Sequence, residues 1–137
     1  MSRILAIDYG TKRTGLAWTD PLQIIATGIG SFDTYKLKDK MQELCKSEDI
    51  SEIVLGFPTR MDGSDTHSTQ AIREFGKWIA TTFPNKILHY RDERFTSKQA
   101  FQTMIDAGLK KKKRRDKHLV NTISATIILQ DFMKERE

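Results

Sequence analysis

The chain has 137 residues, of which 38% are hydrophobic and 30% are charged, so it is long enough for one domain with a single core and too apolar for a disordered chain. No apolar stretch approaches the roughly 20 residues that span a bilayer, and the single cysteine, Cys45, excludes an internal disulfide framework and fits a reducing cytoplasm. The net charge of +5 is concentrated at residues 110–115, which are six consecutive lysines and arginines, and the rest of the chain is close to neutral.

The first part of the chain predicts three strands. Residues 3–8 form a short, nearly continuous apolar run, which is typical of a strand covered on both faces. Gly10 and Gly15 bracket a polar turn, so residues 16–19 are expected to form the second strand of a hairpin. A third strand is expected within residues 22–32.

The rest of the chain alternates helical and strand patterns. Helices are expected over residues 37–45, 71–83, 100–105 and 119–133, strands over 53–57 and 87–91, and a loop rich in turn formers over 59–66. No internal repeat or low-complexity linker divides the sequence. Three antiparallel-type strands followed by this alternation predict one α/β domain over residues 1–137, a sheet with helices packed on it.

Acidic residues end two of the predicted strands. Asp8 closes an otherwise apolar run, and a carboxylate near a sheet interior is costly unless it is paired or bound to a metal. It is either a metal-binding acid at a strand end or a turn aspartate that opens the hairpin. Asp92 and Glu93 directly follow the strand over 87–91, which suits either a divalent cation in a cleft or a surface loop with weak ion pairs. His67 and His89 lack metal-ligand spacing and are expected to be surface or packing residues.

The cationic run at residues 110–115 is typical of a segment that binds phosphates or an anionic surface. A solvated loop that only aids solubility explains the same run. The charge pattern by itself leaves both interpretations open.

Four segments resemble the YqgF/RuvX family, which is known under two functions, Holliday junction resolvase and pre-16S ribosomal RNA nuclease. They are LAIDYGTKRTGLA at the start, VLGFPTRMDGS in the middle, DERFTS after the fifth predicted strand and SATIILQDF near the end. They occur in the family's order and span almost the whole chain. The resemblance implies a ribonuclease H-like fold related to the RuvC resolvases, with a five-stranded mixed sheet, its first three strands antiparallel, flanked by helices.

The resemblance also implies an active site in which acidic residues hold Mg²⁺ or Mn²⁺ for phosphodiester cleavage. Asp8 matches the family's first-strand acid, and Glu93 matches the acid of its DER motif. The family's last helix usually begins with an acid, but this chain has Asn121 at that position, and an amide brings a metal ligand without charge and cannot act as a base. The predicted catalytic and metal-binding residues are therefore Asp8, Glu93 and Asn121, with His118, Asp116 and Asp92 as possible substitutes for the missing acid.

A nuclease of this kind requires cations along the nucleic-acid backbone. The predicted phosphate-binding residues are Lys12, Arg13, Arg60, Lys110, Lys111, Lys112, Lys113, Arg114 and Arg115. The leading hypothesis is a cytoplasmic, metal-dependent endonuclease that acts on structured RNA, the precursor of 16S ribosomal RNA, with ribosomal particles as further partners.

Three other functions fit parts of the pattern. Cleavage of branched DNA at Holliday junctions uses the same chemistry but requires a homodimer that presents two sites, whereas precursor trimming needs only a monomer. A nucleic-acid-binding protein with attenuated catalysis is the second, because Asn121 replaces the third acid. The third follows from residues 8–11, which also resemble the phosphate-binding turn of the sugar kinase, actin and heat-shock-protein ATPases, but a single domain lacks their second phosphate loop.

Overall fold

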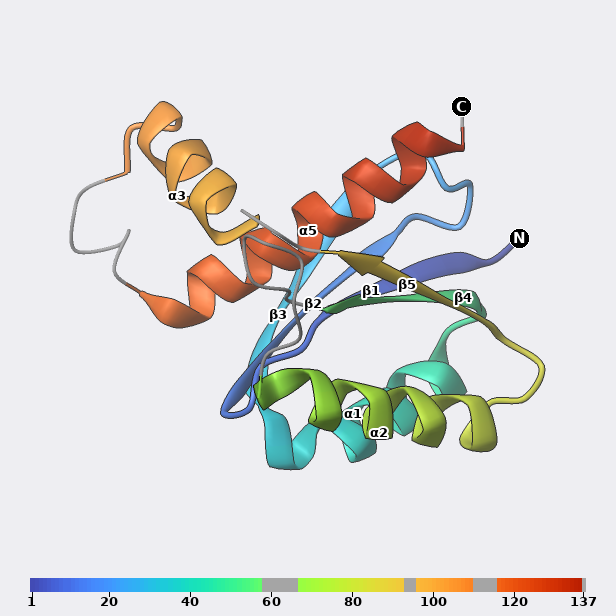
Figure 1. Ribbon diagram of the computed structural model, residues 1–137. Helices are drawn as coiled ribbons and strands as arrows, with labels where there is room; N and C mark the ends of the chain where they lie inside the picture. Colours follow the sequence, from blue (N-terminus) through green and yellow to red (C-terminus); the bar gives the residue numbers. More distant parts are fainter. Residues whose placement is uncertain (58–66, 93–95, 110–115, 137) are drawn as a thin grey trace.

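The computed structural model describes residues 1–57, 67–92, 96–109 and 116–136, and these residues contain one five-stranded sheet (Figure 1). The strands in chain order are β1 (Arg3–Asp8), β2 (Arg13–Thr19), β3 (Ala26–Asp33), β4 (Ile50–Phe57) and β5 (Ile87–Asp92). They lie in the order β3-β2-β1-β4-β5. The β1–β2 and β2–β3 pairs are antiparallel, whereas β4 is parallel to both β1 and β5. The predicted mixed sheet, with its first three strands antiparallel, is confirmed.

Helices cover both faces of this sheet. They are α1 (Leu37–Ser47), α2 (His67–Thr82), α3 (Thr96–Asp106) and α5 (Lys117–Glu135), and a 3₁₀ turn, η1 (Thr34–Lys36), precedes α1. Figure 1 shows α1 and α2 together on one face, and α5 across the other face with α3 beside it. In the described parts of the chain, no helix is both long enough and apolar enough to cross a membrane.

The alternation of side chains along β1 separates two hydrophobic cores. Leu5 and Ile7 pack in the core beneath α1 and α2, whereas Ile4 and Ala6 pack in the core beneath α5. All four side chains are buried, so β1 is covered on both faces, as its continuous apolar run predicts. Because successive strand residues point to opposite faces, Asp8 faces α5 together with Ile4 and Ala6.

The second strand differs from the prediction, because β2 begins at Arg13 and not at Leu16. Gly15, expected at the boundary of a turn, lies inside the strand and pairs with Asp8. Its lack of a side chain makes room for the backbone of Asn121 in α5.

The connection between β2 and β3 is closed by one carboxylate. Asp20 accepts hydrogen bonds from the backbone N–H groups of Ile24 and Ile25, at 2.7 and 2.8 Å. This turn keeps Leu22 and Ile24 out of the sheet, so the third strand begins at Ala26, inside the predicted range of 22–32.

Candidate active site

Five residues form a row across the sheet, one from each strand, in direct register. They are Ser31 on β3, Gly15 on β2, Asp8 on β1, Gly56 on β4 and Arg91 on β5. Residues directly opposite one another on paired strands point to the same face, so the row faces α5. Asp8 is therefore the acidic member of the row, and each of its two neighbours is a glycine without a side chain.

The N-terminal part of α5 rests directly on this row. A Cβ atom built on Gly15 would lie 2.0 Å from the carbonyl oxygen of Asn121, so the helix backbone occupies the space of the missing side chain. One turn earlier, the Nδ1 atom of His118 lies 3.0 Å from the Oγ atom of Ser31. The structure thus brings Asn121 and His118 to the row that contains Asp8, although more than 100 residues separate them in sequence.

The start of α5 is fixed by a helix cap. The carboxylate of Asp116 accepts hydrogen bonds from the backbone N–H groups of His118, at 3.0 Å, and Leu119, at 3.4 Å. Capping of this kind typically stabilises a helix by about 1 kcal/mol. The structure therefore shows a helix-capping role for Asp116, one of the predicted substitute ligands, and it places His118, another, within hydrogen-bonding distance of the row.

The carboxyl ends of β1, β4 and β5 meet at one edge of the sheet, because these three strands are parallel. Ligands of α/β sheets bind outside the carboxyl ends of such strands. Asp8 ends β1 there, and Asp92, in register with Phe57, ends β5. Glu93 is the next residue along the chain, but it lies outside the described residues, as do Arg60 and residues 110–115. Within the described ranges, no three His, Cys, Asp or Glu side chains gather into a metal-binding group.

Two predicted phosphate-binding cations lie within the hairpin that follows Asp8. Lys12 is exposed in the turn, and its carbonyl oxygen accepts a hydrogen bond of 2.9 Å from the N–H group of Thr34. Arg13 opens β2 on the same face as Gly15, and its Nε atom is buried without a hydrogen-bond partner among the described residues. The hydroxyl of Thr34 donates to the carbonyl of Gly10, at 2.6 Å, and so holds this turn in place.

The far end of the row carries a paired cation. Arg91 forms an ion pair with Glu135 near the end of α5, and the hydrogen bond and charge of that carboxylate raise the pKa of Arg91 despite its partial burial. Glu135 therefore compensates the positive charge of Arg91. Lys12 and Arg13 lie in the hairpin that follows Asp8 in the chain.

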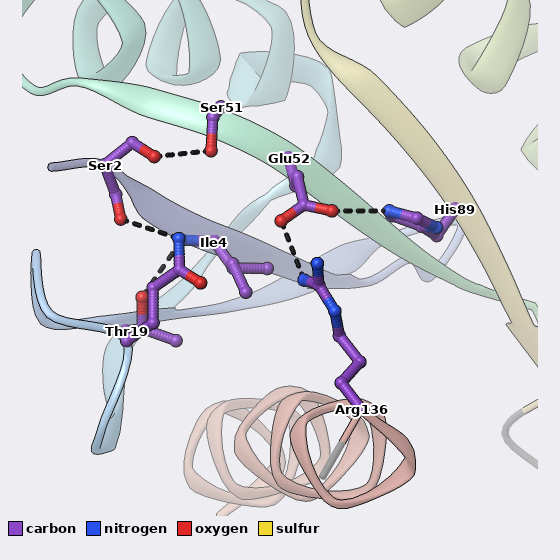
Figure 2. Close-up of polar contacts among 8 residues, drawn as sticks. Ser2, Ile4, Thr19, Ser51, Glu52, His89 and Arg136 are labelled. Atoms are coloured by element: carbon purple, nitrogen blue, oxygen red, sulfur yellow. Dashed lines mark hydrogen bonds and ion pairs between the residues drawn. The ribbon is translucent and has the colours of Figure 1, made fainter.

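A second polar cluster, which the sequence did not predict, lies at the opposite end of β4 (Figure 2). The carboxylate of Glu52 is buried, its Oε1 lies 2.9 Å from Nε2 of His89, and its Oε2 lies 2.7 Å from Nη1 of Arg136. The His89 ring also packs against Phe132, with 4.7 Å between ring centroids. Burial by itself raises the pKa of Glu52, but the hydrogen bonds and charges of Arg136 and His89 hold it below its ordinary value. This cluster ties the last turns of α5 to β4 and β5, and it confirms His89 as a packing residue.

Comparison with known proteins agrees with this architecture. A protein from Christiangramia forsetii, named "Putative pre-16S rRNA nuclease", is 51% identical over 135 residues, which cover 98% of this chain and 100% of that protein. A protein of the same name from Porphyromonas gingivalis is 48% identical over 133 residues, covering 97% of this chain and 96% of that protein.

Among solved structures, the chain is similar to "T. thermophilus RuvC in complex with Holliday junction substrate", with a TM-score of 0.57, 13% identity, and coverage of 99% of this chain and 96% of that one. This likeness confirms the predicted ribonuclease H-like fold. The family model described as "RuvX: Holliday junction resolvase" matches residues 2–135. On this match and the two close relatives, the chain belongs to the RuvX family.

Proposed function

We propose that this chain is a metal-dependent endonuclease that hydrolyses phosphodiester bonds in structured RNA, and that its substrate is the 5′ end of pre-16S ribosomal RNA. The observation that carries the proposal is the position of Asp8. This carboxylate ends β1 in a row between two glycines, beneath the start of α5, at the sheet edge where β5 leads into Glu93. The names of the two relatives support RNA as the substrate.

The donor set fits a hard divalent cation. Mg²⁺ and Mn²⁺ prefer carboxylate, amide and water oxygens, and Asp8, Glu93 and Asn121 are oxygen donors. Such a cation, when bound, neutralises charge on the phosphate and lowers the pKa of a water molecule. Asp8 and Glu93 supply the negative charge that holds it. Asn121 adds only a neutral amide, so metal affinity is lower than with a third carboxylate.

The other residues bind the substrate and handle a proton. Lys12 and Arg13 contact backbone phosphates beside the row, and Arg60 and residues 110–115 supply further positive charge for the substrate. His118 faces Ser31 through Nδ1 and lies one helical turn before Asn121, whose amide cannot act as a base, so its Nε2 atom is the candidate proton acceptor in this part of α5. The enzyme acts in the cytoplasm, where ribosomal precursors are made.

A second candidate function is the resolution of four-way DNA junctions, which the description of the matched family favours. It needs two sites on a homodimer, whereas RNA trimming needs one site on a monomer. Solution mass, measured with and without nucleic acid, therefore separates the two functions independently of cleavage.

The experiment that tests the proposal compares cleavage of a labelled pre-16S RNA fragment and a four-way DNA junction in Mn²⁺, Mg²⁺ or EDTA. Asp8→Asn is the test variant, and Asp39→Asn, which alters an exposed carboxylate on α1, is the matched control. We expect RNA cleavage that requires metal and Asp8 but not Asp39. Preferential cutting of the junction selects the second function, and binding without cutting by the unaltered protein overturns the enzymatic proposal.

A further inference from the structure

A small cavity lies on the face of the sheet opposite to Asp8, between the ends of β4 and β5 and the first half of α2. Its volume is about 270 Å³, and it is lined by Phe57, Thr69, Ile72, Arg73 and Tyr90. The lining combines two aromatic rings, an aliphatic floor, one hydroxyl and one guanidinium, and includes no acidic residue in the described chain. Flat, apolar groups with polar edges fit such a lining.

The two aromatic walls are held in place by the packing of the sheet against α2. The rings of Phe57 and Tyr90 meet edge to face, with 6.4 Å between their centroids. The hydroxyl of Tyr90 occupies the space that a Cβ atom at position 76 of α2 would need. The ring can therefore pack against this helix because residue 76 is a glycine. Tyr90 nevertheless remains 51% exposed. A half-exposed aromatic ring that is already fixed in the folded protein offers a stacking surface, because it loses little further conformational entropy when a ligand binds.

The cavity and the Asp8 row lie at the same edge of the sheet. Gly56 is the cross-strand partner of Asp8, and Phe57 is the next residue of β4, pointing to the opposite face. A strand of nucleic acid with a phosphate at Asp8 therefore reaches the cavity by crossing the end of β4. Arg73 lies at the wall of the cavity, and a guanidinium has five donors, so it can serve a phosphate or a base in addition to its contacts within the protein.

We propose that this cavity receives one unpaired nucleobase of the substrate strand, stacked on Tyr90 beside the nucleotide whose phosphate lies at Asp8. The inference rests on the proposed function and deepens it, because it adds a requirement for an unpaired base next to the cut. A paired base is stacked within its helix and does not enter a cavity of this size. Base–aromatic stacking tolerates all four bases, so the selection is for an unpaired position and not for a sequence.

The test measures binding without cutting, on the Asp8→Asn protein in EDTA. Short RNA strands carry the fluorescent base 2-aminopurine at one unpaired position at a time, and parallel strands carry an abasic site there. Tyr90→Leu removes the ring, and Tyr90→Phe is the matched control that keeps it. We expect one position at which fluorescence is quenched by the parent and by Tyr90→Phe but not by Tyr90→Leu. At that position, the abasic strand should bind about 5- to 150-fold more weakly to the parent and equally to Tyr90→Leu.

The outcomes separate this inference from the proposed function. Cleavage by the unaltered protein together with equal binding of abasic and normal strands overturns the cavity proposal and leaves the nuclease standing. Base-dependent quenching without cleavage in any metal supports the cavity and overturns the nuclease. The abasic comparison needs no variant at Tyr90, so equal binding of the abasic and normal strands overturns the cavity proposal even where Tyr90→Leu does not fold. A DNA strand in the same assay shows whether the cavity distinguishes the two nucleic acids.

Discussion

Replacement of Gly15 by alanine tests how closely α5 is seated over Asp8. The added methyl group would lie 2.0 Å from the carbonyl oxygen of Asn121 and 3.1 Å from the N–H nitrogen of Thr122. Both are backbone atoms within the second turn of α5, so neither can rotate away as the end of a side chain can. Since ordinary contact begins at 3.4 Å, the helix has to move by about 1.4 Å at this point.

This movement has a cost in stability and a larger one in activity. Overpacking of a buried contact destabilises proteins by roughly 1–3 kcal/mol. For a chain of this size that corresponds to a fall in melting temperature of about 4–12 °C. A misplacement of about 1 Å near reacting groups can reduce a rate about 100-fold. We therefore expect Gly15→Ala to remain folded at 25 °C and to lose most of its cleavage activity.

The matched control is Gly28→Ala, which lies on the neighbouring strand under the same helix. Its added methyl group would meet the Cγ2 atom of Thr122 at 2.6 Å, and that atom is the end of a side chain, which can rotate at the cost of one hydrogen bond to His118. Thermal melts and cleavage rates of both variants are compared with those of the unaltered protein. If Gly15→Ala melts and cuts like Gly28→Ala, then α5 does not rest on Gly15 and the geometry of the site described here is wrong.

Three further predictions follow from other contacts. Glu52→Gln should lower the free energy of unfolding by roughly 1–3 kcal/mol at pH 7 in urea melts, because it weakens two partly buried hydrogen bonds to a charged carboxylate. The pKa of Glu52 is depressed in the folded state, so the stability that its carboxylate contributes is fully present above the unfolded pKa of about 4.3 and is lost as the pH falls through the folded pKa. The free energies of unfolding of the two proteins should therefore converge in acid. A constant difference between them down to pH 2 would contradict this. Asn121→Asp should tighten Mn²⁺ binding in calorimetry and raise cleavage, whereas unchanged binding would show that Asn121 does not contact the metal. Lys12→Gln should reduce the magnitude of the slope of log affinity against log salt concentration by about 0.7–0.9. An unchanged slope would show that Lys12 does not contact a phosphate.

Local patterns were sufficient where a residue's environment is set by its neighbours in the sequence. The continuous apolar run of β1 predicted a strand covered on both faces, and the buried positions of Ile4 and Leu5 on opposite faces confirm it. The same run made Asp8 conspicuous as its polar end. The regions of the predicted helices are correct. The last helix, α5, runs from Lys117 to Glu135, and it begins before its apolar pattern because Asp116 caps its first turn.

Local patterns failed where a distant segment determines the role of a residue. Gly15 looks like a turn glycine, but it lies within a strand, where the absence of a side chain makes room for the backbone of Asn121. Glu52 falls just outside the strand predicted over residues 53–57, yet it is buried in β4, where His89 and Arg136, which are 37 and 84 residues away in sequence, bind its carboxylate. One signal was available for it, since a charged residue in a strand that is otherwise buried requires a partner.

The crossing of the sheet by α5 also sets the order in which a newly made chain can mature. One face of the sheet consists of Ile4, Ala6, Ala17 and Val54, and its cover is a helix segment with buried residues from Ala125 to Phe132. During synthesis the first four strands leave the ribosome before this segment does. Their apolar face therefore stays exposed until a chaperone or the rest of the chain covers it. A chain that stops before residue 117 would leave that apolar face exposed, and exposed apolar surface of this kind promotes aggregation. The contact between Gly15 and Asn121 likewise forms only after residue 121 has been added, so a chain that stops before this residue lacks the seating of α5 over the row.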